Sequence, residues 1–299
     1  MTTRGRERRF GAAAARRTAA VLIVAAVAAL STGGCADDVE NPAAAQGTST
    51  ADAALSTTST SSVPPGGRQP TADDKLRVIL AGDSVMNGLA PAVATAHNEG
   101  GESQVAYELA PSIARDAASR VLWQRQLEES HPDLVVMLIG TWERGDANFE
   151  PGDPAWASWY QENVLDPFAD MITSAGTRIL WLGMPAVEND ADTLQLVALN
   201  SQFKALADRD DMVDYVEGGE VLNGPDGGYT DRLPSADGTV ERVRRVDGLH
   251  LCPGGAARLA VPVIQYAQQE WNVSVGLDWE NAPWREPPTL DHPEECPPV

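Results

Sequence analysis

The sequence is poor in positive charge. Its 299 residues include 22 Lys and Arg against 43 Asp and Glu, which gives a formal net charge of −21 at pH 7. A chain this acidic repels the phosphate backbone of nucleic acids and the surface of anionic lipids. We therefore expect no nucleic-acid partner.

The sequence also lacks the short motifs of several enzyme classes. No Gly-x-Gly-x-x-Gly follows an apolar strand, which argues against a dinucleotide-binding fold. Gly-x-Ser-x-Gly is absent too, which argues against an ordinary α/β-hydrolase. The 4 histidines are scattered and the 3 cysteines have no metal-ligand spacing. We expect no metal and no other cofactor.

No apolar run is long enough to span a membrane, but residues 1–34 resemble a signal peptide. An arginine-rich start is followed by the apolar run Ala19 to Leu30, which is shorter than the about 20 residues of a spanning helix. Small residues then precede Cys35, as in a bacterial lipobox, where the cysteine is lipidated. We expect an exported protein anchored to the cell membrane as a lipoprotein. A simple cleaved signal and a secreted protein stay open.

The rest of the chain divides by composition. Residues 35–74 are rich in Ala, Ser, Thr and Pro without apolar periodicity, so they predict a disordered tether. Residues 75–276 have the composition of one folded domain. Residues 277–299 are rich in proline and predict an irregular tail.

Five short apolar segments have the composition of buried strands. They span residues 77–82, 104–109, 133–140, 177–183 and 212–216. Helical stretches are expected at about 87–98, 115–130, 156–175, 190–208 and 254–271, and the Gly- and Asp-rich residues 217–244 predict a long loop. Near-continuous apolar strands that alternate with helices predict a parallel sheet covered on both faces.

Two cysteines remain if Cys35 carries a lipid. In an exported chain the simple pairing is a disulfide between Cys252 and Cys296. The alternative is a buried free thiol at Cys252 and a loose tail.

Ser84 follows the first expected strand, in the tripeptide Gly82-Asp83-Ser84, and precedes a helix. A serine at such a turn exposes its hydroxyl above the sheet and has its N–H near a positive helix terminus. That position suits a nucleophile whose attack creates an oxyanion. Asp and Ser are also favoured helix N-caps, and this role alone explains the tripeptide. Both interpretations stay open at this point.

A serine nucleophile needs a base, and His250 is the best placed of the histidines. It lies just before the last expected helix, and Asp247 precedes it by three positions. In an Asp-x-x-His turn the carboxylate can reach Nδ1–H of the imidazole while Nε2 faces the serine. Such a turn alone is often a surface feature, but its combination with Gly-Asp-Ser at the first strand is far more specific.

The two motifs together resemble the SGNH (GDSL-like) hydrolase superfamily, over about residues 76–271. The resemblance implies a single three-layer α/β/α domain with a five-stranded parallel sheet. It implies Ser84 as nucleophile, His250 as general base and acid, and Asp247 as the orienting carboxylate. The residues around the motifs are most similar to SGNH domains associated with bacterial cell-surface O-acyltransferases, which act on acyl esters of envelope sugars.

Two segments depart from the pattern of that superfamily. A glycine usually follows the second strand, where this chain has Pro111-Ser112-Ile113, so the N–H of Ser112 or Ile113 is the candidate oxyanion donor. After the third strand, Gly140-Thr141-Trp142-Glu143 replaces Gly-x-Asn-Asp. An ionised Glu143 cannot donate a hydrogen bond. Losing one donor costs about 10²–10³ in rate, so efficiency is affected more than reaction class.

The segment Gly140-Thr141-Trp142-Glu143 is nevertheless a candidate for oxyanion or substrate contacts. Trp142 either stacks on a sugar ring or covers the end of the sheet. Glu143 is interpreted as a solvated loop charge.

The resemblance implies an exported serine esterase or acyltransferase that acts on O-acyl groups, most simply acetyl, of cell-envelope carbohydrate. Its partners are then an acylated carbohydrate or another small ester, and the membrane through the lipid anchor. Two alternatives stay open. One is a catalytically weak SGNH-like module that binds polysaccharide, and the other is a lipid esterase or thioesterase.

Overall fold

The structure is a computed structural model that describes residues 68–109, 113, 116–141, 143, 152–235, 237–286 and 292–299. All of these residues belong to one compact unit, Ser59–Val299. The expected signal peptide, Cys35 and most of the expected tether lie outside the described residues. Among the helices of the described part, none is both long and apolar enough to cross a membrane.

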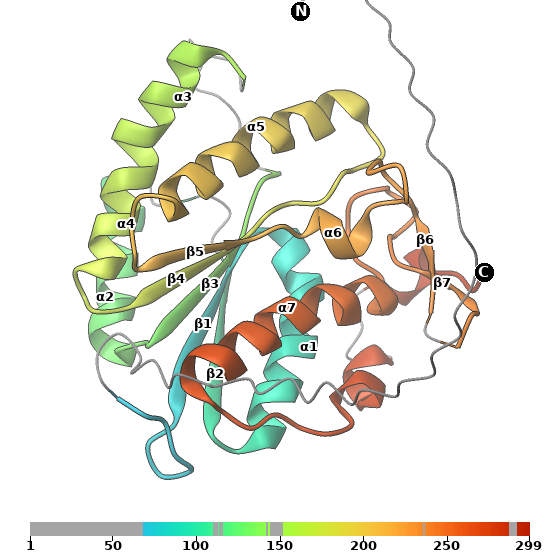
Figure 1. Cartoon of the computed structure of the whole chain (residues 1–299), viewed down its shortest axis with the longest axis horizontal. Coiled ribbons are helices and arrows are strands. Elements are labelled where there is room, and N and C mark those ends of the chain that lie inside the picture. The colour runs from blue at the N-terminus through green and yellow to red at the C-terminus, as the bar shows by residue number, and fades with distance from the viewer. Residues whose placement is uncertain are drawn as a thin grey trace, which may run out of the picture. The chain divides into compact units, whose positions relative to one another are not determined.

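Five parallel strands form the central sheet in the order β2-β1-β3-β4-β5 (Figure 1). They are β1 (Leu76–Gly82), β2 (Ser103–Leu109), β3 (Leu134–Leu138), β4 (Arg178–Leu182) and β5 (Val213–Val216). Strands β3 and β4 are buried along their whole length because helices cover both faces, which is why they are almost continuously apolar. The expected five-stranded parallel sheet is confirmed.

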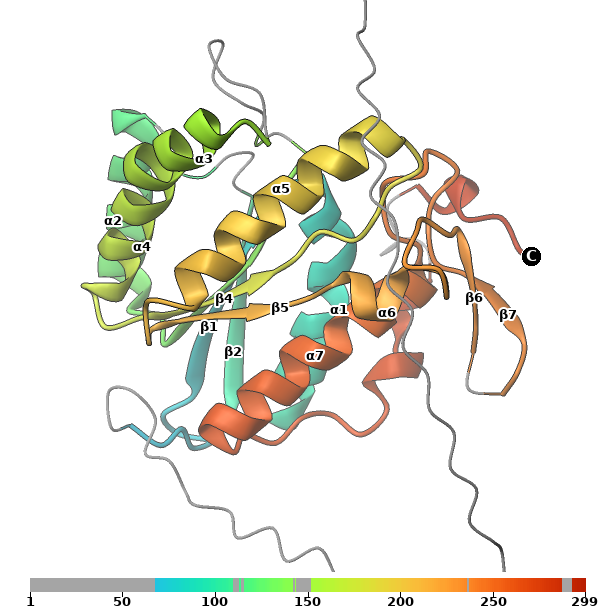
Figure 2. The same ribbon diagram turned by 45° about the horizontal axis from the view of Figure 1, so that its top comes forward.

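Helices form a layer on each face of the sheet (Figures 1 and 2). One layer contains α1 (Ser84–Gly100) and α7 (Pro253–Trp271). The other contains α2 (Ala117–Ser130), α3 (Pro154–Tyr160), α4 (Asp166–Thr173) and α5 (Asp190–Ala207). Alternate residues of β1 serve the two cores, because successive side chains of a strand point to opposite faces: Val78 and Leu80 pack toward α1 and α7, and Ile79 toward the second layer. The predicted three-layer architecture is confirmed.

The single helix expected near 156–175 is interrupted. A π-helical turn, η1 (Gln161–Leu165), joins α3 to α4. Pro167, the second residue of α4, has no N–H to continue the i→i−4 hydrogen bonds, which gives a physical reason for the change of winding.

Residues 217–244, expected as one long loop, contain three short elements. They are α6 (Gly219–Leu222) and an antiparallel hairpin of β6 (Arg232–Pro234) and β7 (Val240–Arg242). Strands of three residues are too short to show an alternating pattern, so the sequence gives no strand signal here.

Both ends of the described chain are held against the domain. Arg68 forms an ion pair with Asp133, and the amide of Gln69 donates to the carbonyl of Trp271, so contacts begin seven residues before the expected boundary at Lys75. In the C-terminal segment, the side chains of Trp279 and Trp284 are buried and complete the core beside α1.

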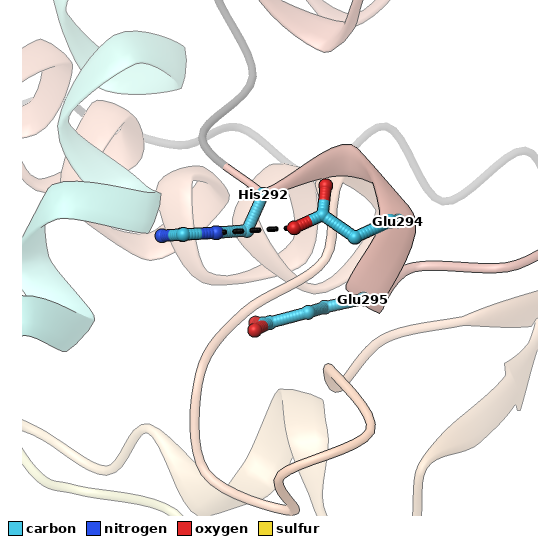
Figure 3. Close-up of side chains that lie close together, drawn as sticks. All are labelled: His292, Glu294 and Glu295. Carbon is cyan, nitrogen blue, oxygen red and sulfur yellow. Dashed lines mark hydrogen bonds and ion pairs between the residues drawn. The ribbon is translucent and has the colours of Figure 1, made fainter.

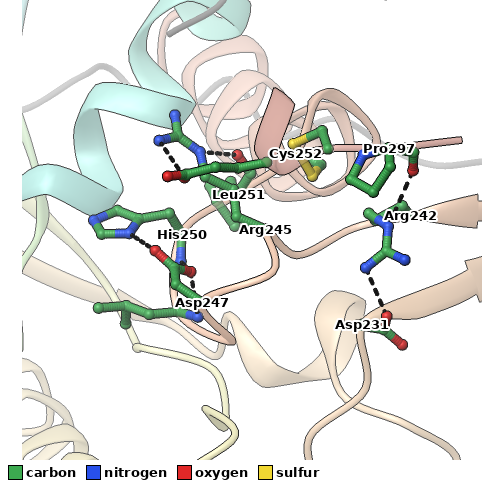
Figure 4. Close-up of a disulfide and its surroundings, with 11 residues drawn as sticks. Asp231, Arg242, Arg245, Asp247, His250, Leu251, Cys252 and Pro297 are labelled. Atoms are coloured by element: carbon green, nitrogen blue, oxygen red, sulfur yellow. Dashed lines mark hydrogen bonds and ion pairs between the residues drawn. A yellow bond between two sulfur atoms is a disulfide. The ribbon is translucent and has the colours of Figure 1, made fainter. Parts of the chain in front are cut away.

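A disulfide joins Cys252, at the start of α7, to Cys296 in the C-terminal segment (Figure 4). The predicted pairing is therefore present. The same segment is also held by hydrogen bonds from the Val246 N–H to the Glu295 carbonyl and from Arg242 Nε to the Pro297 carbonyl. The irregular C-terminal segment thus lies directly against the loop that carries Asp247 and His250.

Candidate active site

Ser84 is the first residue of α1 and follows the end of β1 at Gly82. A side chain at Gly82 would place its Cβ 2.0 Å from the carbonyl oxygen of Leu138, so the close approach of β1 to β3 requires glycine here. Asp83, not Ser84, is the N-cap: its carboxylate accepts the N–H of Val85 at 2.9 Å. The capping role therefore leaves the Ser84 hydroxyl free for another partner.

That partner is His250. Its Nε2 lies 2.7 Å from Ser84 Oγ, and its Nδ1 lies 2.5 Å from Asp247 Oδ2. Ser84 lies 166 positions before His250 in the sequence, whereas Asp247 lies in the same turn as His250. The imidazole side chain is 24% exposed. The structure thus brings together the three residues that the sequence motifs single out, in the relative geometry of a serine-histidine-aspartate triad.

The Asp247 turn is shaped by its own backbone hydrogen bonds. Asp247 Oδ1 accepts the N–H groups of Leu249 at 2.9 Å and His250 at 3.0 Å, while Gly248 has φ +72°, a conformation that favours glycine. Partial burial raises the pKa of Asp247. The hydrogen bonds from the His250 ring and from the two N–H groups lower this pKa by more, so it stays below its ordinary value. The Asp247 carboxylate is therefore ionised at neutral pH, and its contact with Nδ1 can orient the imidazole.

Further contacts fix this turn to the rest of the domain. The Arg245 N–H donates to the His250 carbonyl at 2.8 Å, and the Glu188 N–H, in the loop after β4, donates to the Gly248 carbonyl at 3.1 Å. Figure 4 shows His250 and Asp247 on the same loop as Cys252 and its disulfide. The turn that carries His250 is thus bonded to Arg245, at its start, and to the loop after β4.

Asp83 has a second structural role besides capping α1, and the sequence interpretation missed it. Its carboxylate is fully buried, and its Oδ2 accepts the Gly140 N–H at 3.0 Å, the Thr141 N–H at 2.9 Å and the Thr141 hydroxyl at 2.5 Å. The carboxylate therefore joins the end of β1 to the residues after β3. The N–H groups of Gly140 and Thr141 are taken up by this bond, so neither is an oxyanion donor. On this point the expectation for the two residues is wrong.

Glu143 is buried and not a solvated loop charge, so that interpretation is wrong. Only 2% of the residue is exposed, and its carboxylate accepts the Ile113 N–H at 2.9 Å and the Tyr160 hydroxyl at 2.8 Å. The Ile113 N–H is thus engaged by Glu143, which removes it as an oxyanion donor. Ser112 and Trp142, the other two candidates, lie outside the described residues.

The backbone N–H of Ser84 is a candidate oxyanion donor. It belongs to the first turn of α1, whose N–H groups have no partner within the helix and carry the positive end of its dipole. Within the described part of the chain, no acceptor is bound to it. A carbonyl attacked by the Ser84 hydroxyl can therefore place its developing charge against this N–H.

A cavity of about 180 Å³ adjoins the Asp247 turn. Its apolar lining comes from α5, from the loop after β4 and from the turn itself, and comprises Val187, Leu196, Leu199 and Leu249. Its polar lining includes Thr141, Glu143, Glu188, Asn189, Asp192, Gln195 and Asp247. The cavity lies beyond the carboxyl ends of the strands, where open α/β sheets bind their ligands.

One protein-family model matches more than half of the chain. Residues 77–266 match the family described as "Protein of unknown function (DUF459)". The chain belongs to this family. No curated protein matches the chain.

Several solved structures resemble this DUF459 member. A GDSL-like lipase from Bacteroides thetaiotaomicron has 15% identity and a TM-score of 0.43, over 67% of this chain and 92% of its own. A carbohydrate esterase family 3 protein from Talaromyces cellulolyticus has 17% identity and a TM-score of 0.42, over 67% and 100%. A catalytic mutant of an acetylxylan esterase from Geobacillus stearothermophilus has 14% identity and a TM-score of 0.42, over 66% and 94%.

Among the described residues of this DUF459 member, one group has metal-ligand spacing: His292, Glu294 and Glu295 (Figure 3). His292 Nδ1 lies 3.2 Å from Glu294 Oε1, and Glu295 forms an ion pair with Arg245. The first two side chains are more than half exposed. The Glu295 carboxylate already pairs with Arg245, and the Glu294 carboxylate already contacts His292. We therefore assign no metal to this exposed group.

The sequence interpretation missed the contacts of two residues, Asp83 and Tyr160, and only Asp83 gave a visible signal. Asp83 was visible as an N-cap, but only the register of β1 against β3 shows that its second oxygen reaches Gly140 and Thr141. Tyr160, the partner of Glu143, gave no signal because it lies on a helix 17 positions further along the chain.

Proposed function

We propose that this chain is a serine esterase or acyltransferase that acts on small O-acyl groups, most simply acetyl, of cell-envelope carbohydrate. The observation that carries the proposal is the pair of contacts of His250, at 2.7 Å to Ser84 Oγ and at 2.5 Å to Asp247 Oδ2. A serine hydroxyl is a weak nucleophile unless an adjacent base removes its proton, and this arrangement supplies the base and its orienting carboxylate.

The reaction has two halves. His250 Nε2 takes the proton of Ser84 as its Oγ attacks the acyl carbonyl, and the Ser84 N–H stabilises the oxyanion. The imidazolium then gives its proton to the departing alcohol oxygen, which leaves an acyl-serine. Water or a sugar hydroxyl enters by the reverse steps, with His250 again as base, and releases a free acid or an acylated sugar.

As the described residues shape it, the cavity beside the Asp247 turn is small; Asp247 lines it, and Ser84 and His250 do not. Its volume of about 180 Å³ lies below the roughly 300–1,000 Å³ of sites that enclose a drug-sized ligand. A long acyl chain needs a wider apolar space. Within the described part of the chain no wide apolar space adjoins the Asp247 turn, which supports a small ester over the alternative of a lipid esterase or thioesterase.

The proposal includes export to the cell envelope and attachment there through a lipidated Cys35. The disulfide between Cys252 and Cys296 supports an oxidising compartment, because such bonds are rare in the bacterial cytosol. The acidic surface that the net charge of −21 implies supports a neutral carbohydrate partner over an anionic polymer.

One observation favours the second candidate function, a polysaccharide-binding module of weak catalytic power. The N–H groups of Ile113, Gly140 and Thr141 are all engaged by carboxylates. Among the described residues, the Ser84 N–H is then the remaining candidate oxyanion donor. Each oxyanion donor that is missing costs about 10²–10³ in rate.

A single pair of measurements tests the proposal. The wild-type domain should hydrolyse p-nitrophenyl acetate and react with a fluorophosphonate probe at Ser84. Ser84→Ala should lower turnover by about 10⁶ and abolish labelling. Ser130→Ala is the matched control, since its hydroxyl donates to the Gln126 carbonyl on α2 and takes no part in the site.

The two candidate functions differ in outcome. Failure of the probe to label wild-type Ser84, together with retained binding of an acetylated polysaccharide, would favour the binding module. Equal hydrolysis by wild type and Ser84→Ala would eliminate the triad.

A further inference from the structure

Arg244 is a buried arginine whose positive charge is not neutralised. The residue is fully buried, and its Nη2 donates to the carbonyl of Ala186 at 3.3 Å. Among the described residues, neither Nε nor Nη1 of Arg244 has a hydrogen-bond partner, and no carboxylate forms an ion pair with the guanidinium. Burial lowers the pKa of Arg244 to about 10, so the group stays charged at neutral pH.

Tyr229 lies near this charge but does not offset it. Burial and the neighbouring carboxylates of Glu188 and Asp231 raise the pKa of the Tyr229 hydroxyl above its ordinary value, so the phenol is neutral at neutral pH. An unpaired charge in the interior of a protein costs free energy, and its replacement by an apolar side chain of similar size is often neutral or stabilising. The stability of the fold therefore gives no reason for an arginine at position 244.

Arg244 belongs to the hairpin that carries the base, residues 243–252, which we call the base hairpin. Arg244 is bridged to Leu251, the residue after His250, as an antiparallel partner. The next residue, Arg245, donates its N–H to the carbonyl of His250 at 2.8 Å. Figure 4 shows Arg245, His250 and Leu251 together on this hairpin. The backbone of Arg244 is thus one paired position away from the base.

The base hairpin packs directly on the helix of the nucleophile. Gly88 lies on α1, four positions after Ser84, which is about one turn. A side chain at Gly88 would place its Cβ 3.2 Å from Leu251 Cβ, so Leu251 and α1 are in close contact. Because His250 precedes Leu251, the seating of the hairpin on α1 determines how near its Nε2 comes to Ser84 Oγ.

Two bonds hold the base hairpin to the loop after β4. The carbonyl of Gly248 accepts the N–H of Glu188 at 3.1 Å, and the guanidinium of Arg244 donates to the carbonyl of Ala186. The first bond joins backbone to backbone, whereas the second comes from a side chain that a substitution can remove. A charged donor forms a stronger hydrogen bond than a neutral one, and a low-dielectric interior strengthens it further.

We propose that Arg244 is a positioning residue of the triad. By holding the carbonyl of Ala186, its guanidinium keeps the base hairpin seated on α1 and so maintains the 2.7 Å contact between His250 Nε2 and Ser84 Oγ. The proposal rests on the proposed function and adds a residue that touches no reacting atom. The buried charge is kept for activity at a cost in stability, a trade-off that is common near active sites.

The test replaces Arg244 by Met, which is apolar and of similar length, and by Lys, which keeps a charged donor. In Arg244→Met, kcat for p-nitrophenyl acetate and the rate of Ser84 labelling by a fluorophosphonate should both fall about 10²-fold, because displacement of a catalytic group by about 1 Å costs this much. KM should change less than about twofold, since Arg244 does not contact the ester. Arg244→Lys should recover about tenfold of the lost rate.

Urea unfolding separates positioning from a structural role. Arg244→Met should have a urea midpoint equal to or above that of the wild type, because it removes a buried charge without a counter-ion. Arg178→Met is the matched control. Arg178 is also buried, but it pairs with Asp214 at 2.5 Å and donates to the Tyr266 hydroxyl at 3.0 Å, at the start of β4. Its replacement should lower the midpoint and leave kcat unchanged.

Each outcome decides the proposal. An unchanged kcat in Arg244→Met would overturn the positioning role and leave the esterase intact. A lower urea midpoint or a chain that fails to fold, with no recovery in Arg244→Lys, would assign Arg244 to the fold and also overturn it. A wild-type protein that neither hydrolyses the ester nor is labelled at Ser84 would overturn the esterase and the positioning role together.

Discussion

The carboxylate of Asp83 binds Thr141 twice, through the backbone N–H at 2.9 Å and through the hydroxyl at 2.5 Å. Asp83 ends the turn after β1, and Thr141 follows β3, the neighbouring strand. The chain leaves β1 through α1 on one face of the sheet and leaves β3 through helices on the other face. The bond thus spans the point where the direction of winding reverses, and it fixes the residues beside Ser84.

We expect Asp83→Asn to damage both stability and activity. The amide replaces one acceptor oxygen by a donor that faces N–H groups in a fully buried site. The free energy of unfolding should fall by about 2–4 kcal/mol, and kcat should fall with it because Ser84 is the next residue. Urea unfolding and ester hydrolysis measure the two effects.

Asp153→Asn provides the matched control for that substitution. Asp153 caps α3 through the same local bond, from the Ala155 N–H at 2.7 Å, but it is exposed. Its replacement should cost about 1 kcal/mol or less, since Asn is also a good N-cap. Equal losses in the two variants would show that the bond to Thr141 contributes nothing.

Asp247→Asn should reduce turnover with little loss of stability. The amide can hold the His250 ring only in the wrong tautomer, with Nδ1 as acceptor, and it cannot stabilise the imidazolium. We expect kcat to fall by about 10³–10⁴. The exposed Asp237, whose carboxylate accepts the Thr239 N–H at 2.9 Å in another turn, is a control position, and Asp237→Asn should leave kcat unchanged. A wild-type rate in Asp247→Asn would exclude the orienting role.

His97 should make the domain less stable in mild acid. It is fully buried in α1, with Nδ1 at 3.2 Å from Ser103 Oγ, and burial lowers its pKa to about 4. Because the unfolded chain binds a proton near pH 6.5 and the folded chain does not, its contribution is complete above pH 6.5 and is lost as the pH falls toward about 4. The loss amounts to about 3 kcal/mol.

The measurement is the free energy of unfolding in urea at pH 7.5 and at pH 5. His97→Gln does not titrate, so its stability should change less between the two pH values than that of the wild type. Parallel changes in the two proteins would assign the acid sensitivity to other groups.

The Cys252–Cys296 disulfide should stabilise the domain and the triad loop. It closes a loop with a sequence separation of 44, which by the chain-entropy model contributes about 4 kcal/mol. Reduction, or replacement of both cysteines by serine, should lower the urea midpoint by the corresponding amount. Activity below the transition should fall less, because the hydrogen bonds of Arg245 and Glu188 still hold the turn. An unchanged midpoint after complete reduction would contradict this.

Much of the fold was determined by the sequence alone. Apolar runs such as Leu134–Leu138 are strong signals because a strand covered on both faces has no polar side to show. The triad candidates were also visible, since Asp247 and His250 lie within one turn and Ser84 lies at a strand-to-helix junction. Local motifs of this kind depend on residues that are near in the sequence, and therefore sequence can reveal them.

Only the tertiary structure decided what the polar groups around the triad do. Glu143 was expected in solvent, but packing buries it against Ile113 and Tyr160. Asp83 could be read as a cap, yet the register of β1 with β3 gives it Gly140 and Thr141 as further partners. A hydrogen bond between residues far apart in the sequence depends on which strands are neighbours and how they are aligned, and no local pattern encodes that alignment.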